Sequence, residues 1–145
     1  MNLKAICSLK CYNLDLPVNF KRVTPSDQDL DLTFLYEIAD GSNEFVIESI
    51  DMLLQQAPEL LGAIGSALNA SDWPAASAAA HKLKPSMGFF GMTLSQELLQ
   101  EIEQLCKAGG QDPSAISSKY SQAEELISQS MVALTKLKAE KEAEL

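Results

Sequence analysis

The sequence predicts an all-α protein, an antiparallel up-and-down four-helix bundle with an additional short N-terminal helix. Apolar residues recur at steps of three and four from about residue 43 onward, which is the periodicity of amphipathic helices. Good helix formers such as Ala, Leu, Glu, Gln and Lys dominate the composition. The links between the apolar stripes are short, as between the antiparallel neighbours of a bundle. At 145 residues the chain fits one domain, which we assign to residues 27–145, preceded by an extension over 1–26 of uncertain structure.

The first two expected helices lie on either side of Gly41. A short leading helix covers residues 29–40, and a much longer one begins near residue 43. Pro58 interrupts the second and should kink or split it, because proline has no backbone N–H to donate. The apolar stripe of this second helix consists of Val46, Ile50, Leu53, Ala57, Leu61, Ile64 and Leu68.

The third expected helix begins at Asp72, a favoured N-cap residue, with Pro74 in its first turn. Gly91 ends it. Pro85 lies in its interior, and whether this proline kinks or breaks the helix is left open. The inner stripe consists of Ala76, Ala79, Ala80, Leu83, Met87 and Phe90.

The last two expected helices are separated by Gly109 and Gly110. Thr93, with Gln96 three residues later, has the pattern of a capping box that opens the fourth helix. The stripe of this helix is Leu94, Leu98, Ile102 and Leu105. Asp112 caps the final helix, whose stripe is Ile116, Tyr120, Ala123, Ile127, Met131, Leu134 and Leu137.

Charge and composition exclude several classes of protein. The net charge is −9, and because residues 1–26 carry +3, the remaining 119 residues carry −12. The strongly negative charge of residues 27–145 argues against nucleic-acid binding, which relies on clustered Lys and Arg. No apolar run approaches the roughly 20 residues of a membrane span, and the N-terminus has no signal-peptide pattern. We therefore expect a cytoplasmic monomer without a membrane partner.

Three cysteines, Cys7, Cys11 and Cys106, are too few and too scattered for a disulfide framework or a closed zinc site. We expect reduced thiols of no special role, no metal and no cofactor.

The single histidine, His81, lies in the one locally positive stretch of the otherwise acidic residues 27–145. Between residues 60 and 96 there is one acid, Asp72, against Lys82 and Lys84. Such an island of positive charge favours an anionic partner site.

His81 should point away from the core. Leu83, a residue of the core stripe, is two positions on and therefore about 200° around the helix. The residues expected to share the face of His81 are Ser77, Ala78, Lys84, Pro85 and Gly88. An incidental surface histidine is the plain alternative. Against it, Gly88 and Pro85 are costly inside a helix, by about 1 and 3 kcal/mol, and close approach of a second protein would explain their presence.

The segment AAHKLKPSMGFFGMTLSQELLQEIE, residues 79–103, resembles the signature of histidine-containing phosphotransfer (Hpt) domains. In that family a hydrophobic residue and a lysine follow the phosphorylated histidine at +2 and +3, with glycine at +10 and an amphipathic helix beyond. The positions that match in order and spacing are His81, Leu83, Lys84, Ser86, Gly91, Ile102 and Glu103. Pro85 departs from the pattern, because the family often has glycine there.

The resemblance implies that His81 accepts a phosphoryl group from the aspartyl-phosphate of a receiver domain and passes it to another receiver. The partners would be response-regulator receiver domains, hybrid histidine kinases, or both. Lys84, with Lys82 as a second candidate, would offset phosphoryl charge. Glu103 would orient the imidazole through Nδ1, although it fits equally well as a solvated helix charge. Docking would use Ser77, Ala78, Pro85 and Gly88.

Other functions fit the sequence less well. No Gly-rich phosphate loop is present, so the chain is expected to be a stoichiometric carrier and not a kinase. A helical-bundle adaptor that kept the Hpt fold without phosphotransfer is the main alternative. A haem- or metal-binding bundle using His81 with Met87 or Met92 is disfavoured, because Met87 belongs to the core stripe and His81 does not.

Overall fold

The protein is all-helical in a computed structural model that describes residues 29–145. The prediction of an all-α fold is therefore confirmed for this part of the chain. The extension assigned to residues 1–26 lies outside the described residues. The helices are α3 (Thr33–Ala39), α4 (Asn43–Asn69), α5 (Trp73–Phe89), α6 (Thr93–Lys107) and α7 (Pro113–Ala143).

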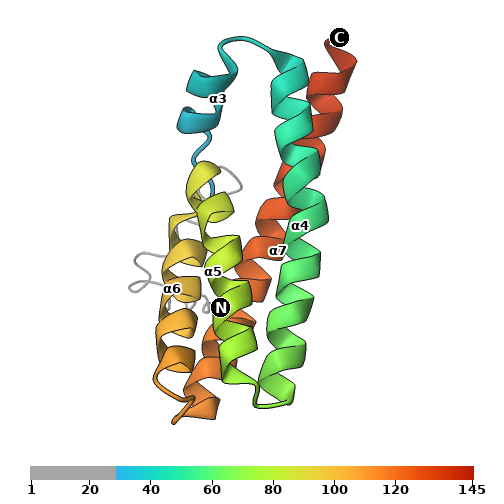
Figure 1. Ribbon diagram of the computed structural model, residues 1–145. Coiled ribbons are helices and arrows are strands. Elements are labelled where there is room, and N and C mark those ends of the chain that lie inside the picture. The colour runs from blue at the N-terminus through green and yellow to red at the C-terminus, as the bar shows by residue number, and fades with distance from the viewer. Residues whose placement is uncertain (1–28) are drawn as a thin grey trace, which may run out of the picture.

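The four longer helices form an antiparallel bundle. Each packs on two neighbours: α4 on α5, α5 on α6, α6 on α7, and α7 back on α4. Figure 1 shows α4 and α7 side by side as the two longest helices, with the shorter α5 and α6 along one part of them. The short helix α3 lies beyond the end of α5 and α6 and contacts α4. This arrangement confirms the predicted bundle with one additional short helix.

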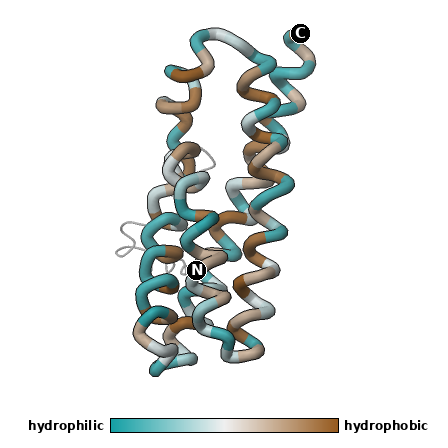
Figure 2. The backbone as a smooth tube through the Cα atoms, viewed as in Figure 1, coloured by the Kyte–Doolittle hydropathy of each residue, from teal (hydrophilic) through white to brown (hydrophobic). Residues whose placement is uncertain are grey.

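All four long helices contribute to one apolar core, to which α3 adds Leu35. In each long helix apolar residues alternate with hydrophilic ones, as amphipathic helices require (Figure 2). Ile50, Leu83, Ile102 and Ile127, one from each long helix, are all fully buried. The predicted stripes of α4, α5 and α7 are buried or half-buried throughout.

Pro58 does not split its helix. The helix α4 runs without interruption from Asn43 to Asn69, and Pro58 is exposed on its surface. At the surface, water can hydrogen-bond the backbone carbonyl that proline leaves without a helical donor. Pro85, similarly exposed, lies within the continuous helix α5.

The predicted capping box at Thr93 is wrong. Met92 occupies the N-cap position of α6, and no side chain of that turn caps the helix. Asp29 supplies the cap from far along the chain: its two carboxylate oxygens accept hydrogen bonds of 2.8 Å from the backbone N–H groups of Leu94 and Ser95. A carboxylate suits this position because it satisfies free N–H groups at the positive end of the helix.

The buried face of α6 also differs from the predicted stripe. Leu94 is 54% exposed, and Leu98 and Leu105 are only half-buried. The buried residues of α6 are Ser95, Leu99, Ile102, Glu103 and Cys106. Two of these buried residues, Ser95 and Glu103, are polar, and each has a polar partner. The Ser95 hydroxyl donates a hydrogen bond of 2.6 Å to the Asp29 carboxylate, and the partners of Glu103 are described below.

The first expected helix is shorter than predicted. Only Thr33–Ala39 is helical, and the backbone before it is tied to the end of α5 by a hydrogen bond from Asp31 N–H to the Phe90 carbonyl. Of the three cysteines, the structure describes Cys106, which is buried and forms no disulfide with another described residue.

Candidate functional site

His81 projects from the middle of α5 into solvent. Asp72 caps the start of this helix, as predicted, by accepting a hydrogen bond from the Ala75 N–H. The side chain of His81 is 69% exposed, whereas Leu83 is fully buried. The prediction that the imidazole points away from the core is therefore confirmed. The same geometry separates His81 from Met87 and Met92, which are fully buried in the core, so it gives no support to a haem site shared by these residues.

Glu103, on the neighbouring helix α6, lies beneath the imidazole. Its Oε2 is 2.9 Å from His81 Nδ1, and its side chain is only 5% exposed. When Nδ1 carries the proton, it donates to this oxygen and Nε2 keeps its lone pair. Nε2 forms no hydrogen bond with any residue between 29 and 145.

Two lysines complete the surroundings of the Glu103 carboxylate. Lys84 Nζ, from α5, lies 2.7 Å from Oε1, and Lys107 Nζ, one turn further along α6, lies 3.0 Å from Oε2. Oε1 accepts no hydrogen bond of good geometry from the described residues, although the Lys84 ammonium lies beside it. The sequence reasoning missed Lys107, although its i,i+4 spacing from Glu103 would have indicated the pair.

The cations around Glu103 keep it ionised. Burial by itself would raise the pKa of this carboxyl, but the interactions with the Lys84 and Lys107 ammonium groups and with His81 outweigh burial and lower the pKa from 4.5 to about 2. At neutral pH Glu103 is therefore a carboxylate that can accept a hydrogen bond from the His81 Nδ1–H.

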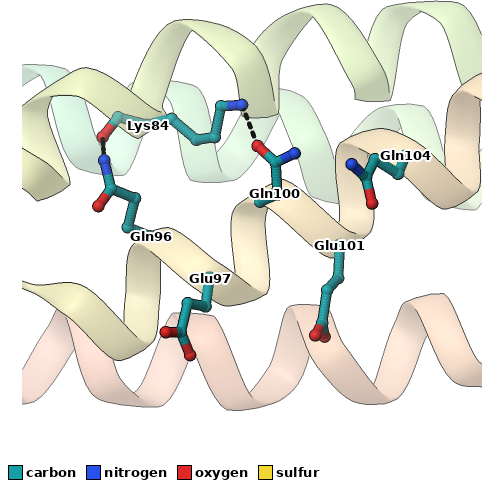
Figure 3. A pocket seen from close by; sticks show the side chains of 6 residues that line it. All are labelled: Lys84, Gln96, Glu97, Gln100, Glu101 and Gln104. Carbon is teal, nitrogen blue, oxygen red and sulfur yellow. Dashed lines mark hydrogen bonds between the residues drawn. The ribbon is translucent and has the colours of Figure 1, made fainter.

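Lys84 is less exposed than the sequence suggested. Its side chain is 19% exposed and reaches across to α6, where the ammonium donates to Gln100 Oε1. Gln96 Nε2 donates to the backbone carbonyl of Lys84 at 3.4 Å, and Figure 3 shows both bonds at the edge of a polar hollow. Lys84 is therefore fixed between the two helices that carry His81 and Glu103.

The residues predicted for docking do not all share the exposed face. Ser77 is buried, and this corrects its assignment to the surface; the face of α5 that packs against α6 reaches further round the helix than the apolar stripe implied. Ala78, Pro85 and Gly88 are exposed. Lys82 is exposed beside His81, and both line a hollow of about 690 Å³ between α5 and α6.

An apolar groove lies one turn beyond His81, between α4 and α5. It has a volume of about 400 Å³, and Met52 on its rim is 70% exposed. Its apolar lining consists of Phe45, Met52, Leu53, Pro85, Phe89 and Phe90. The sequence reasoning missed this groove because Phe45 and Met52 do not belong to the predicted core stripe of α4, although Phe45 packs against the core.

The described residues contain no group of three or more His, Cys, Asp or Glu side chains that could hold a metal ion. None of the helices formed by residues 29–145 combines the length and apolarity needed to span a bilayer.

The described residues thus form a four-helix bundle that presents one exposed histidine, supported by a buried carboxylate of the next helix. The chain matches the Hpt domain family over residues 48–137, which is more than half of its length, and it belongs to that family. No curated protein and no solved structure matches it significantly. Hpt domains act in phosphorelays, typically as phosphotransfer shuttles and not as catalytic enzymes, and they interact with receiver domains.

Proposed function

We propose that this protein is a histidine phosphocarrier in which His81 accepts a phosphoryl group from the aspartyl-phosphate of one receiver domain and passes it to another. The observation that supports this best is the pairing of an exposed imidazole with a buried carboxylate 2.9 Å from its Nδ1. An incidental surface histidine has no need of such a partner. In keeping with this role, the protein would work in the cytoplasm as a monomer.

The chemistry needs no proton transfer in the accepting step. The Nε2 lone pair attacks phosphorus, the Nε2–P bond forms, and the bond from phosphorus to the aspartate oxygen breaks. The electron pair of that bond leaves with the aspartate, which becomes a carboxylate. His81 keeps its Nδ1 proton and becomes a positively charged phospho-imidazole. The Glu103 carboxylate, hydrogen-bonded to Nδ1–H, stabilises that positive charge and holds the ring in the reactive tautomer.

The lysines provide positive charge for the transferred group. Lys84 lies one turn from His81 and is fixed by Glu103 and Gln100, so its ammonium is already in place when a partner arrives. Lys82 is adjacent and exposed, and we assign it a weaker contribution through the local potential. The magnesium ion and acidic pocket that such chemistry uses would belong to the receiver.

The receiver would dock on the surface around His81. A typical stable interface buries about 800 Å² on each partner, so contact extends well beyond the histidine. Ala78, Pro85 and Gly88 leave room for close approach because their side chains are small or absent. The apolar groove that begins at Pro85 would receive an apolar part of the receiver.

Phosphoryl transfer to the full chain tests this proposal. Purified receiver domains are charged with labelled acetyl phosphate and mixed with the wild-type protein or with His81→Gln. We expect the wild type to gain a label that is stable to base and labile to acid, as an N–P bond is, and the variant to gain none while melting at the same temperature. A variant that takes up label at the wild-type rate would refute the role of His81. A wild type that binds receivers without taking up label would point to the adaptor function instead.

A further inference from the structure

Lys107 shares an acceptor atom with His81. Its Nζ lies 3.0 Å from Glu103 Oε2, the same oxygen that lies 2.9 Å from His81 Nδ1. Lys107 itself is 66% exposed, whereas the carboxylate that it contacts is 5% exposed. An exposed cation thus has direct access to the buried group that faces the imidazole.

The charge of Glu103 creates a difficulty that Lys107 can relieve. A carboxylate behind the ring orients the imidazole, but its negative charge also repels an anionic phosphoryl group that approaches Nε2. With one carboxylate and two lysines in contact, the group formed by Glu103, Lys84 and Lys107 carries a net charge of +1. Without Lys107 that net charge would be zero.

Lys107 also restricts the carboxylate. Lys84 holds Oε1 from α5, and Lys107 holds Oε2 from within α6, so the plane of the carboxylate is fixed from two directions. Lys107 is four residues after Glu103, and residues at this spacing lie on the same face of a helix. The contact therefore needs no rearrangement of the bundle.

We propose that Lys107 is a positioning residue for phosphoryl transfer: it holds Glu103 Oε2 against His81 Nδ1 and offsets the charge of the carboxylate toward the incoming phosphoryl group. This inference rests on the proposed role of His81 as phosphoryl acceptor. Lys107 acts through Glu103 and not by contact with the phosphoryl group, and this distinction makes the proposal testable.

The experiment compares four proteins: the wild type, Lys107→Gln, Glu103→Gln and the double variant. A receiver domain charged with acetyl phosphate serves as donor, and both the maximal transfer rate and the half-saturating receiver concentration are measured. We expect Lys107→Gln to lower the maximal rate about fivefold, the upper range for loss of one partly exposed ion pair, with little change in half-saturation. In the Glu103→Gln background the same change should have a much smaller effect, because no carboxylate remains to be held and only the charge of Lys107 is lost.

Lys119→Gln is the matched control. Lys119 forms an ion pair of 2.8 Å with Glu101, whose side chain is 51% exposed, and neither residue contacts Glu103. We expect the Lys119→Gln variant to accept the phosphoryl group at the wild-type rate. Lys107→Arg should restore most of the rate, because arginine keeps the charge. A normal rate in Lys107→Gln, or an equal loss in both backgrounds, would overturn the proposal, the latter because it would indicate a direct contact.

The ring ¹⁵N signals of the only histidine in the chain give a second measurement that needs no receiver. They should shift in Lys107→Gln and stay unchanged in Lys119→Gln. Unchanged signals in Lys107→Gln would mean that Lys107 has no influence on the imidazole. If the wild type accepts no phosphoryl group but the signals still shift, it is the proposed function that fails and not the coupling between Lys107 and His81.

Discussion

Glu103 Oε2 and His81 Nδ1 lie 2.9 Å apart across the interface between α5 and α6. The imidazole is mostly exposed, yet its orientation depends on a carboxylate held in the packed interior of the bundle. The geometry of the histidine is therefore set by helix packing, which changes little when a partner binds. An exposed side chain without this contact would have to be ordered during each transfer, at a cost in entropy.

Lys84→Ala should slow phosphoryl acceptance without unfolding the bundle. The change removes the ammonium beside Glu103 Oε1 and the hydrogen bond to Gln100. We expect the free energy of unfolding to fall by about 1–2 kcal/mol, because Glu103 is buried and loses one of its cations. The loss of rate should be smaller at high salt if part of the effect is long-range attraction of the receiver. Transfer rates at two ionic strengths measure this, and an unchanged rate at low salt would exclude a role for the lysine.

The lowered pKa of Glu103 makes stability depend on pH. The carboxyl is ionised more readily in the folded protein than in the unfolded chain, so it stabilises the fold above its unfolded pKa of about 4.5, and this contribution is lost as the pH falls toward about 2. The difference in melting temperature between the wild type and Glu103→Gln should therefore be largest at pH 5 or above and shrink between pH 5 and pH 2. Thermal unfolding followed by circular dichroism measures it. A difference that stays constant over this range would show that the carboxylate is not held as its contacts indicate.

The helices and the outward direction of His81 could be predicted because they depend on local periodicity. The apolar spacing in α4, α5 and α7 fixes which face is buried, and the opposition of His81 and Leu83 follows from helix geometry alone. These features need no knowledge of which helices are neighbours.

The predictions of the cap and the buried face of α6 were wrong because residues far away in the sequence determine both. Asp29 caps α6 from 65 residues away, and no local pattern around Thr93 reveals it. Ser95 is buried because it bonds to Asp29, and Glu103 because two lysines and a histidine surround it. A stripe built from apolar residues alone passes over both positions.

Gly88→Lys should weaken docking of the receiver while leaving stability nearly unchanged. Gly88 is exposed two turns beyond His81 on α5. A Cβ there would lie 2.8 Å from Gln96 Nε2, the end of a flexible side chain that can move aside. The gain of about 1 kcal/mol from replacing a helical glycine should roughly offset that adjustment.

Receiver affinity and melting temperature together test this prediction. Ser128→Lys, at an exposed position of α7 on the far side of the bundle from α5, adds the same charge and length away from the site. It should leave affinity unchanged. Equal affinities for the two variants would place Gly88 outside the interface, and a large drop in the melting temperature of Gly88→Lys would show that the glycine is required for packing.

Met52→Glu should weaken receiver binding about tenfold, the equivalent of about 1.4 kcal/mol. Met52 is 70% exposed on the rim of the apolar groove that begins one turn beyond His81. A carboxylate there would have to be desolvated against an apolar part of the receiver, and the burial of the methionine side chain would be lost. Val132→Glu is the matched control, because Val132 is 72% exposed on α7, which contributes no residue to the groove. Both variants should melt close to the wild type, since neither side chain is part of the core. Binding isotherms with the same unphosphorylated receiver domain distinguish the two variants, and only Met52→Glu should lose affinity. An equal loss in both would mean that the added negative charge, and not the groove, controls docking.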